Sequence, residues 1–344
     1  MRNIVIHKAK KLVIEDVKPE RPSAGQVQIK MAAGGICGSD LHYYNHGGIG
    51  DSIRVKQPMI LGHEVAGYVS ERGKGVDDLQ VGDLVAISPS RPCGSCQYCH
   101  KGQQNHCENM RFYGSAMPFP HIQGAFRESL VCDASQCVKA DGLTPGEAAM
   151  AEPLAVCLHA TRRAGDMMGK RVLITGSGPI GTLSVLAARS AGATEVVVTD
   201  LASPALEYAK TIGADRTINV IEEPEALNEY QAGKGTFDVL YECSGAAPAL
   251  AAGIATMKPR GIVMQLGMGG DMNVPVQALT AKELDLRGSF RFHEEFATAV
   301  QLMQQGQINV KPLISHTLPI EKAVEAFELA SDRNIAMKTQ IAFN

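Results

Sequence analysis

The sequence predicts an α/β protein in which a β-rich N-terminal part precedes a doubly wound parallel sheet. Residues 1–35 alternate apolar and polar side chains between turns, as short antiparallel strands do. From about residue 170, short apolar runs alternate with helical patterns, which is typical of parallel strands joined by right-handed crossovers. The tail after about residue 290 is too short to form a domain of its own.

Length and composition indicate a globular protein of two domains. The chain has 344 residues, of which 45% are hydrophobic and 20% charged. The formal net charge of −3, without a basic tract, gives no reason to expect nucleic acid or a membrane as a partner. We expect no signal peptide and no transmembrane helix. Nine cysteines, four of them clustered, favour a reducing compartment, so we expect a cytoplasmic protein.

Two segments of the N-terminal part concentrate reactive side chains. In residues 34–44, glycines flank Cys37, and a hydroxyl, an acid, an imidazole and a phenol follow. In residues 61–67, His63 and Glu64 stand at the start of an apolar strand. Each group by itself is more often a packing residue than a ligand. If the fold brought Cys37, His63 and a carboxylate together, they would form a three-ligand zinc site with one open position, the catalytic pattern.

Four cysteines follow at the spacing C-x2-C-x2-C-x7-C, namely Cys93, Cys96, Cys99 and Cys107. The segment lacks the period of a strand or helix, so we expect a loop that is ordered by four thiolates on one Zn²⁺. A pair of disulfides is disfavoured by the reducing compartment. An iron–sulfur cluster is disfavoured because its usual run has a shorter last spacing followed by proline. The spacing therefore favours a closed structural zinc site.

Two further segments have a less specific pattern. Residues 110–124 are irregular and contain two prolines and three aromatic side chains, so they form either a pocket wall or ordinary surface packing. A strand is predicted over 82–87, and a helical pattern begins at Pro145. Within that pattern, Glu152 is a carboxylate held directly before a proline.

The run Gly176-Ser177-Gly178-Pro179-Ile180-Gly181 predicts a dinucleotide-binding turn. An apolar strand over 171–175 precedes it, a helix to about Gly192 follows, and the next strand, 195–200, ends in Asp200. The glycines allow a pyrophosphate to approach the backbone and the N-terminus of the helix. Asp200 would accept hydrogen bonds from the adenosine ribose. The alternative is an ordinary β-α-β turn.

The alternation of helices and strands continues to the C-terminus. Helices are predicted over 205–212, 248–257, 295–304 and 321–330, and strands over 217–220, 237–243, 261–266 and 284–290.

These motifs resemble those of the zinc-containing medium-chain alcohol/polyol dehydrogenases over essentially the whole chain. Residues 35–43 and 62–64 match the catalytic-zinc motifs, the four cysteines match the structural-zinc lobe, and residues 151–154 match an interdomain acid motif. The resemblance implies a GroES-like β-rich catalytic domain and a Rossmann domain with the active site between them. The catalytic domain would comprise about 1–153 and 291–344, and the Rossmann domain 154–290.

The resemblance also implies the chemistry. The chain would bind two Zn²⁺, and the catalytic ion would be held by Cys37 and His63 with either Glu64 or Glu152, since relatives differ in this acid. Ser39 matches the hydroxyl that receives the substrate proton, and His42 is a possible next member of the relay. Hydride would pass from a secondary alcohol to the nicotinamide.

Substrate and cofactor preferences follow from single positions. Tyr43 and Arg291 resemble substrate-contacting positions of the polyol branch, and Arg111 is a second candidate cation, with a salt bridge as its alternative role. Ala205 stands where many polyol relatives carry an arginine, so NAD⁺ is favoured over NADP⁺. We expect a small-molecule sugar acid or polyol as substrate and a homodimer or homotetramer. A zinc-binding nucleic-acid module and a catalytically inactive dinucleotide-binding protein are the competing interpretations.

Overall fold

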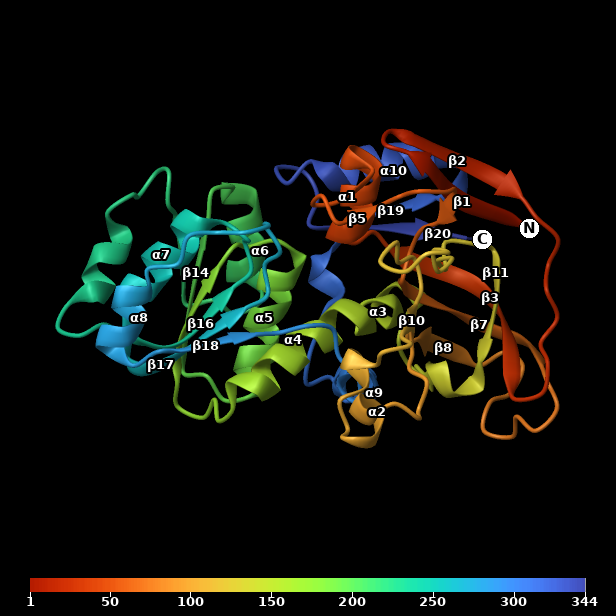
Figure 1. Cartoon of the computed structure of the whole chain (residues 1–344), viewed down its shortest axis with the longest axis horizontal. Helices are drawn as coiled ribbons and strands as arrows, with labels where there is room; N and C mark the ends of the chain where they lie inside the picture. Colours follow the sequence, from red (N-terminus) through yellow and green to blue (C-terminus); the bar gives the residue numbers. More distant parts are fainter. Residues whose placement is uncertain (344) are drawn as a thin grey trace.

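The structure is a computed structural model that describes residues 1–343 and has two lobes (Figure 1). One lobe combines the N-terminal strands with the C-terminal segment, and the other holds a parallel sheet covered by helices. The fold class predicted from the sequence is therefore confirmed. Within the described residues, no helix has the length and apolar character needed to cross a membrane.

The β-rich lobe is built on a seven-stranded sheet of order β12-β8-β7-β3-β20-β19, with β11 also paired to β3. Its strands are β3 (Gln26–Gly35), β7 (Glu64–Arg72), β8 (Leu84–Ile87), β11 (Ser129–Asp133), β12 (Cys137–Lys139), β19 (Ile314–Pro319) and β20 (Lys338–Ala342). Smaller sheets join β1 (Arg2–Lys8), β2 (Lys11–Asp16) and β6 (Met59–Ile60), β4 (Gly48–Ile49) with β5 (Ile53–Arg54), and β9 (Ser90–Arg91) with β10 (Arg111–Phe112). The helix α1 (Gly38–His46), which the sequence did not predict, follows β3 directly.

The pairing of β20 with β3 joins the C-terminal segment to the N-terminal part of the β-rich lobe. The strands run antiparallel, with Gln340 opposite Gly35 and Ile341 opposite Gly34. Because β3 leads into α1 and β20 begins at Lys338, this pairing places a lysine beside Cys37 and Glu64. The helix α10 (Ala323–Ser331) precedes β20, and residues 332–337 form the connection between them.

The second lobe is a six-stranded parallel sheet of order β15-β14-β13-β16-β17-β18. This is the doubly wound order, in which the first strand of the unit lies at the centre. Its strands are β13 (Arg171–Thr175), β14 (Glu195–Asp200), β15 (Arg216–Asn219), β16 (Phe237–Glu242), β17 (Met257–Gln265) and β18 (Asp285–Gly288). The covering helices include α5 (Pro179–Ser190), α6 (Ser203–Thr211), α7 (Ala247–Ala255) and α8 (Val276–Lys282), of which α8 was not predicted.

Two helices lie between the lobes, α4 (Ala151–Ala164) and α9 (Glu295–Gln304) (Figure 1). The short helix α3 (Pro145–Ala149) precedes α4, and its N-cap Thr144 forms a capping box with Glu147. Buried side chains of both lobes pack against α4 in one apolar core, which includes Ala66 of β7, Leu154 of α4 and Leu183 of α5. The boundary between the lobes is thus packed.

The prediction of an unstructured loop over 93–107 was wrong in part. The segment contains the short helix α2 (Gln97–His100) and a 3₁₀ turn over Gln104–His106. Both are single turns, which are too short to show a helical period in the sequence.

Candidate active site and zinc sites

Cys37, His63 and Glu64 come together at the junction of β3, α1 and β7. Cys37 is the N-cap of α1, and Glu64 is the first residue of β7. One candidate ligand atom from each of the three side chains lies within 4.8 Å of the others. Burial and the charge of Glu64 raise the pKa of the Cys37 thiol to about 12. A thiol, an imidazole and a carboxylate in a buried cluster form the donor set of a catalytic zinc site, so these residues fit the metal.

Asp40 lies beside His63 and bonds the backbone on both sides of the cluster. Its Oδ2 accepts a hydrogen bond from the backbone N–H of Cys37 at 3.1 Å, and its Oδ1 accepts one from Gly62 at 3.2 Å. The same Oδ1 lies 3.8 Å from Nδ1 of His63, which is buried and has no hydrogen-bond partner in the described part of the chain. Carboxylates that face one ring nitrogen of a histidine leave the other for a metal. Asp40 was not identified as a site residue from the sequence.

Lys338 holds Glu64 in a buried ion pair. Its Nζ donates to both carboxylate oxygens, at 2.8 and 2.7 Å, and to the carbonyl oxygen of Ile36 at 3.2 Å. On the other side, a Cβ at Gly35 would lie 2.1 Å from Oε2 of Glu64, so only glycine fits there. These contacts fix the carboxylate next to Cys37. Lys338 was also missed, because its partner is far away in the sequence.

Glu152, the alternative carboxylate, lies outside this three-residue group. It is buried in the first turn of α4. Burial raises the pKa of its carboxyl to about 8, and the charges of Glu64 and Cys37 act in the same direction. The structure therefore brings both acids near the candidate metal site, with Glu64 at ligand distance and neutralised by Lys338.

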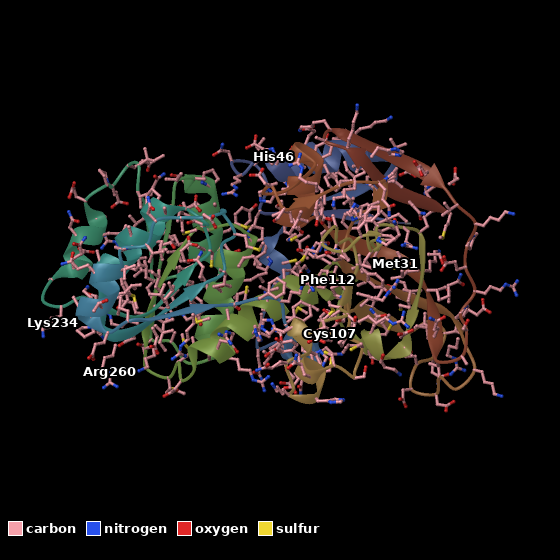
Figure 2. The ribbon with its side chains drawn as sticks, in the orientation of Figure 1. Met31, His46, Cys107, Phe112, Lys234 and Arg260 are labelled. Carbon is pink, nitrogen blue, oxygen red and sulfur yellow. The ribbon has the colours of Figure 1, made fainter. Side chains whose placement is uncertain are left out.

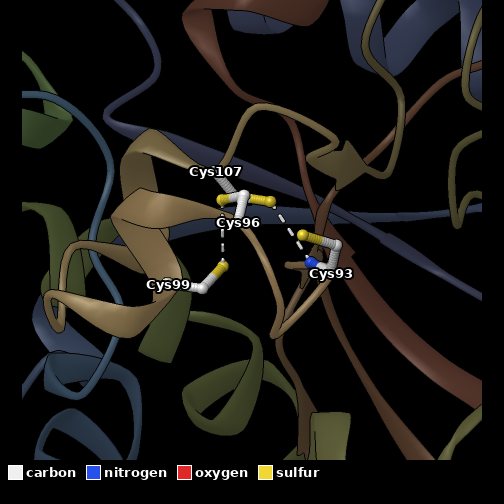
Figure 3. A group of neighbouring side chains, drawn as sticks. All are labelled: Cys93, Cys96, Cys99 and Cys107. Atoms are coloured by element: carbon white, nitrogen blue, oxygen red, sulfur yellow. Dashed lines mark hydrogen bonds between the residues drawn. The ribbon is translucent and has the colours of Figure 1, made fainter.

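The four cysteines of the second cluster converge as predicted (Figure 3). Their sulfur atoms lie within 4.8 Å of one another, and Cys96, Cys99 and Cys107 are buried. The backbone N–H of Ser95 lowers the pKa of Cys93 to about 5, whereas burial raises that of Cys99 to about 12. The four sulfur atoms fit a closed tetrahedral zinc site.

The cysteine lobe also supports the segment that carries Arg291. Nδ2 of Asn105 donates to the carbonyl oxygen of Phe290 at 3.0 Å, and the ring of His106 stacks on that of Phe290. The next residue, Arg291, has a left-handed backbone with φ of 56°. A non-glycine residue in this conformation has to be held by its surroundings.

The glycine turn has the geometry of a dinucleotide site. It connects β13 to α5, and Gly178 is the N-cap of that helix. A Cβ at Gly181 would lie 1.8 Å from the carbonyl oxygen of Gly176, so the helix packs against the turn only with glycine at this position. Asp200 accepts from the backbone N–H groups of Ser177, Leu201 and Ala202 at 2.5, 2.7 and 2.9 Å. Pro179 and Ile180 begin α5.

One cavity of about 210 Å³ unites the reactive cluster with the glycine turn. This interlobe cavity is lined by Cys37 and Glu64 from the β-rich lobe and by residues of the parallel-sheet lobe, among them Gly176, Gly178, Gly181 and Asp200. A dinucleotide that is bound at the turn would thus extend toward the candidate metal ligands.

The predicted substrate and relay residues lie around the same cluster. Ser39 is half-buried in the first turn of α1, and His42 is exposed one turn later. Tyr43 is buried, and its hydroxyl oxygen accepts from the backbone N–H of Ala116 at 3.1 Å. The guanidinium of Arg291 lies 4.3 Å from the ring centre of Phe112, and burial lowers its pKa to about 10 despite the nearby Glu152 and Tyr43.

The structure does not bring Arg111 to this cluster. In β10, Phe112 faces inward, with its ring centre 5.5 Å from that of His63, near the border between the lobes (Figure 2). The neighbouring Arg111 points to the opposite face, because successive side chains of a strand alternate. It lines a separate cavity of about 830 Å³ together with Arg21, Arg91 and His121. Of the segment 110–124, Phe112 therefore lies beside His63 and Arg291, whereas Arg111 lines the separate cavity.

The fold and the two cysteine-containing clusters define a zinc-binding dehydrogenase that uses a nicotinamide dinucleotide. Family models support this class directly. Residues 23–143 match the alcohol dehydrogenase GroES-like domain, and residues 179–305 match the zinc-binding dehydrogenase domain.

Individual relatives agree with the family models. The chain is 44% identical to L-idonate 5-dehydrogenase (NAD(P)(+)) of Escherichia coli (strain K12), with 92% of this chain and 91% of the relative covered. It is 38% identical to sorbitol dehydrogenase of Gallus gallus, with 94% of this chain and 92% of the relative covered. The crystal structure of L-idonate 5-dehydrogenase from Escherichia coli superposes with a TM-score of 0.93 at 40% identity, covering 99% and 97% of the two chains. The chain belongs to the zinc-containing medium-chain alcohol/polyol dehydrogenase family, and it is a zinc-dependent, NAD(P)-linked alcohol dehydrogenase.

Proposed function

We propose that the enzyme oxidises L-idonate at C5 to 5-keto-D-gluconate and catalyses the reverse reduction. The observation that carries the reaction type is the interlobe cavity, which places Cys37 and Glu64 in one space with the glycine turn. Support for the substrate comes from the name of the relative that is 44% identical and from a cation, Arg291, that lies near Tyr43 and Glu152.

We assign the residues of the reaction as follows. Cys37, His63 and Glu64 would hold the catalytic zinc, and Glu152 would either exchange with Glu64 or bond a water molecule there. When they are bound, zinc lowers the pKa of the alcohol and the nicotinamide accepts hydride.

The proton that leaves the alcohol needs a path to solvent. Ser39 is half-buried beside Cys37 and would receive it first. His42 lies one helical turn later with part of its side chain exposed, and its partial burial together with the charges of His46 and Arg333 lowers the pKa of its imidazole. A neutral imidazole at this position accepts a proton and releases it to water.

The substrate carboxylate, four carbons from the reacting carbon, would bind Arg291. A planar guanidinium can hold a carboxylate with two hydrogen bonds. The cation–π contact with Phe112, at 4.3 Å from the ring centre, would help to hold the guanidinium in place. Tyr43 would contact a hydroxyl of the sugar chain.

A sorbitol or xylitol dehydrogenase is the second candidate, because several sorbitol dehydrogenases are 37–38% identical over more than nine-tenths of the chain. The test is a side-by-side assay of NAD⁺ reduction with L-idonate, D-gluconate, sorbitol, xylitol and L-threonine. We expect the highest kcat/KM with L-idonate. If sorbitol or xylitol is preferred by tenfold or more, about 1.4 kcal/mol of transition-state binding, the second candidate replaces the first.

We further propose NAD⁺ as the preferred cofactor, since Asp200 would repel a 2′-phosphate. The proposed domain division, 1–153 with 291–344 against 154–290, is supported by the pairing of β20 with β3. We also propose a cytoplasmic homodimer or homotetramer. Size-exclusion chromatography with light scattering tests the oligomeric state.

A further inference from the structure

A second cavity continues the interlobe cavity along the carboxyl ends of the parallel strands. This sheet-end cavity has a volume of about 440 Å³ and is lined by Thr199, Asp200, Leu201, Val220, Ser244 and Pro248, among others. Four residues line both cavities, namely Gly176, Asp200, Ser244 and Arg333. The first three belong to the parallel-sheet lobe, and Arg333 comes from the connection between α10 and β20 of the β-rich lobe.

The side chains that line the two cavities leave little unpaired positive charge for the phosphates of a bound dinucleotide. The charged residues lining them are Glu64, Asp200, Arg333 and Lys338. Lys338 is already occupied, because its three donors bond both oxygens of Glu64 and the carbonyl of Ile36. Asp200 directs its carboxylate oxygens to three backbone N–H groups at the turn. A pyrophosphate would therefore add negative charge beside an acid.

Arg333 is the cation that is free to offset this charge. It is exposed, and it makes no hydrogen bond or ion pair to another residue within 1–343. Arg333 lines both cavities together with Asp200 and Gly176, so a dinucleotide bound at the glycine turn would carry its phosphates into a space that Arg333 borders. A guanidinium binds phosphate oxygens with charge-assisted, often bidentate hydrogen bonds.

We propose that Arg333 binds a phosphate group of the dinucleotide and thereby sets the affinity for the cofactor. The inference rests on the proposed cofactor site and deepens it. Arg333 reaches across from the β-rich lobe, so its contact would also tie the two lobes together when the cofactor is bound.

Direct binding tests the proposal without any alcohol, so the result does not depend on which substrate the enzyme oxidises. NADH and NADPH are titrated by fluorescence into zinc-loaded wild type, Arg333→Leu, Arg333→Lys and Arg21→Leu. Arg21→Leu is the matched control, because Arg21 is also an exposed arginine of the β-rich lobe but lines the separate large cavity and neither of these two. Calorimetry with adenosine, ADP and 2′,5′-ADP then separates the phosphate positions, and thermal unfolding shows that each variant is folded.

We expect Arg333→Leu to raise the Kd of at least one reduced cofactor by about tenfold or more, with recovery in Arg333→Lys and no change in Arg21→Leu. Equal losses for NADH and NADPH, shared by ADP, assign the contact to the pyrophosphate. A larger loss for NADPH and 2′,5′-ADP assigns it to the 2′-phosphate. The proposal is overturned if all Kd values stay within twofold of wild type, or if adenosine loses as much affinity as the phosphate-bearing ligands. Failure to bind either reduced cofactor in the wild type would instead contradict the dinucleotide site itself.

Discussion

Nζ of Lys338 lies 2.8 and 2.7 Å from the two carboxylate oxygens of Glu64, and both side chains are almost completely buried. Removal of one partner from a buried ion pair leaves an uncompensated charge, which costs about 3–5 kcal/mol. A bound metal cation would replace part of the lost compensation.

We therefore expect Lys338→Met to lower the thermal midpoint strongly in zinc-free protein and less in zinc-loaded protein. Scanning calorimetry of both forms measures the difference. Lys139→Met is the matched control, because Lys139 pairs with Asp83 at the surface and such pairs contribute about 0–1 kcal/mol. An equal loss in both forms would show that Glu64 does not contact the metal.

Local motifs could be predicted from the sequence because their members are close together. The four cysteines lie within fifteen residues, and the glycine turn is defined by the strand before it and the helix after it. For these motifs, spacing alone determines which side chains meet. The expected geometry at Gly181 and Asp200 follows from the same local pattern.

The remaining contacts depend on tertiary structure. Lys338 and Arg333 reach the site only because β20 pairs with β3, about 300 residues away in the sequence. The face to which Arg111 points depends on the register of a two-residue strand, and such a strand has no readable period. Cys37 and His63 were identified as ligands by family resemblance, since neither position alone distinguishes a ligand from a packing residue.

Metal analysis tests the two zinc sites separately. We expect about two Zn²⁺ per chain in the wild type and about one in either Cys37→Ser or Cys107→Ser. Cys37→Ser should remain folded without turnover. Cys107→Ser should lose thermal stability, because three thiolates no longer order the lobe that supports Phe290 through Asn105. Normal turnover in Cys37→Ser would contradict the catalytic assignment, and Cys132→Ser, outside both clusters, serves as the control.

The lowered pKa of the Glu295 carboxylate predicts that the stability of the protein depends on pH. Burial would raise its pKa, but hydrogen bonds from His159, the backbone of His293 and Arg162 outweigh burial and hold the pKa well below its usual range. Because the folded-state pKa is depressed, the stabilisation is complete above the unfolded value of about 4.3 and is lost as the pH falls below it.

We expect Glu295→Gln to be destabilised by about 1–3 kcal/mol at pH 7, with the difference from wild type shrinking below about pH 4.3. The thermal midpoints of the variant and the wild type, recorded from pH 7 to below about pH 4.3, measure this difference in stability. Glu294→Gln is the control, since Glu294 bonds the same arginine but is exposed. A difference that is constant with pH would exclude the ionised carboxylate as its source.

Arg291 and Arg111 form a pair of variants that tests substrate recognition. Hydrogen bonds to a charged group contribute about 1.5–3 kcal/mol, so Arg291→Leu should lower kcat/KM for L-idonate by roughly 10- to 150-fold. The loss with sorbitol should be smaller. Arg111→Leu, in the separate cavity, should leave both values within about twofold. If Arg291→Leu lowers kcat/KM equally for L-idonate and for sorbitol, Arg291 does not bind the substrate carboxylate.

Asp200 combines a charge effect with a structural one. Replacement by alanine should narrow the preference for NAD⁺, but it also leaves the backbone N–H groups of Ser177, Leu201 and Ala202 without their acceptor. Asp200→Asn removes the charge and retains one acceptor oxygen, so it separates the two effects. We expect the ratio of kcat/KM for NAD⁺ over NADP⁺ to fall by about tenfold in Asp200→Asn, which corresponds to about 1.4 kcal/mol. Asp238→Asn is the control, because Asp238 also accepts from a backbone N–H on this sheet but lines neither of the two cavities. An unchanged ratio in Asp200→Asn would show that repulsion by this carboxylate does not set the choice of cofactor.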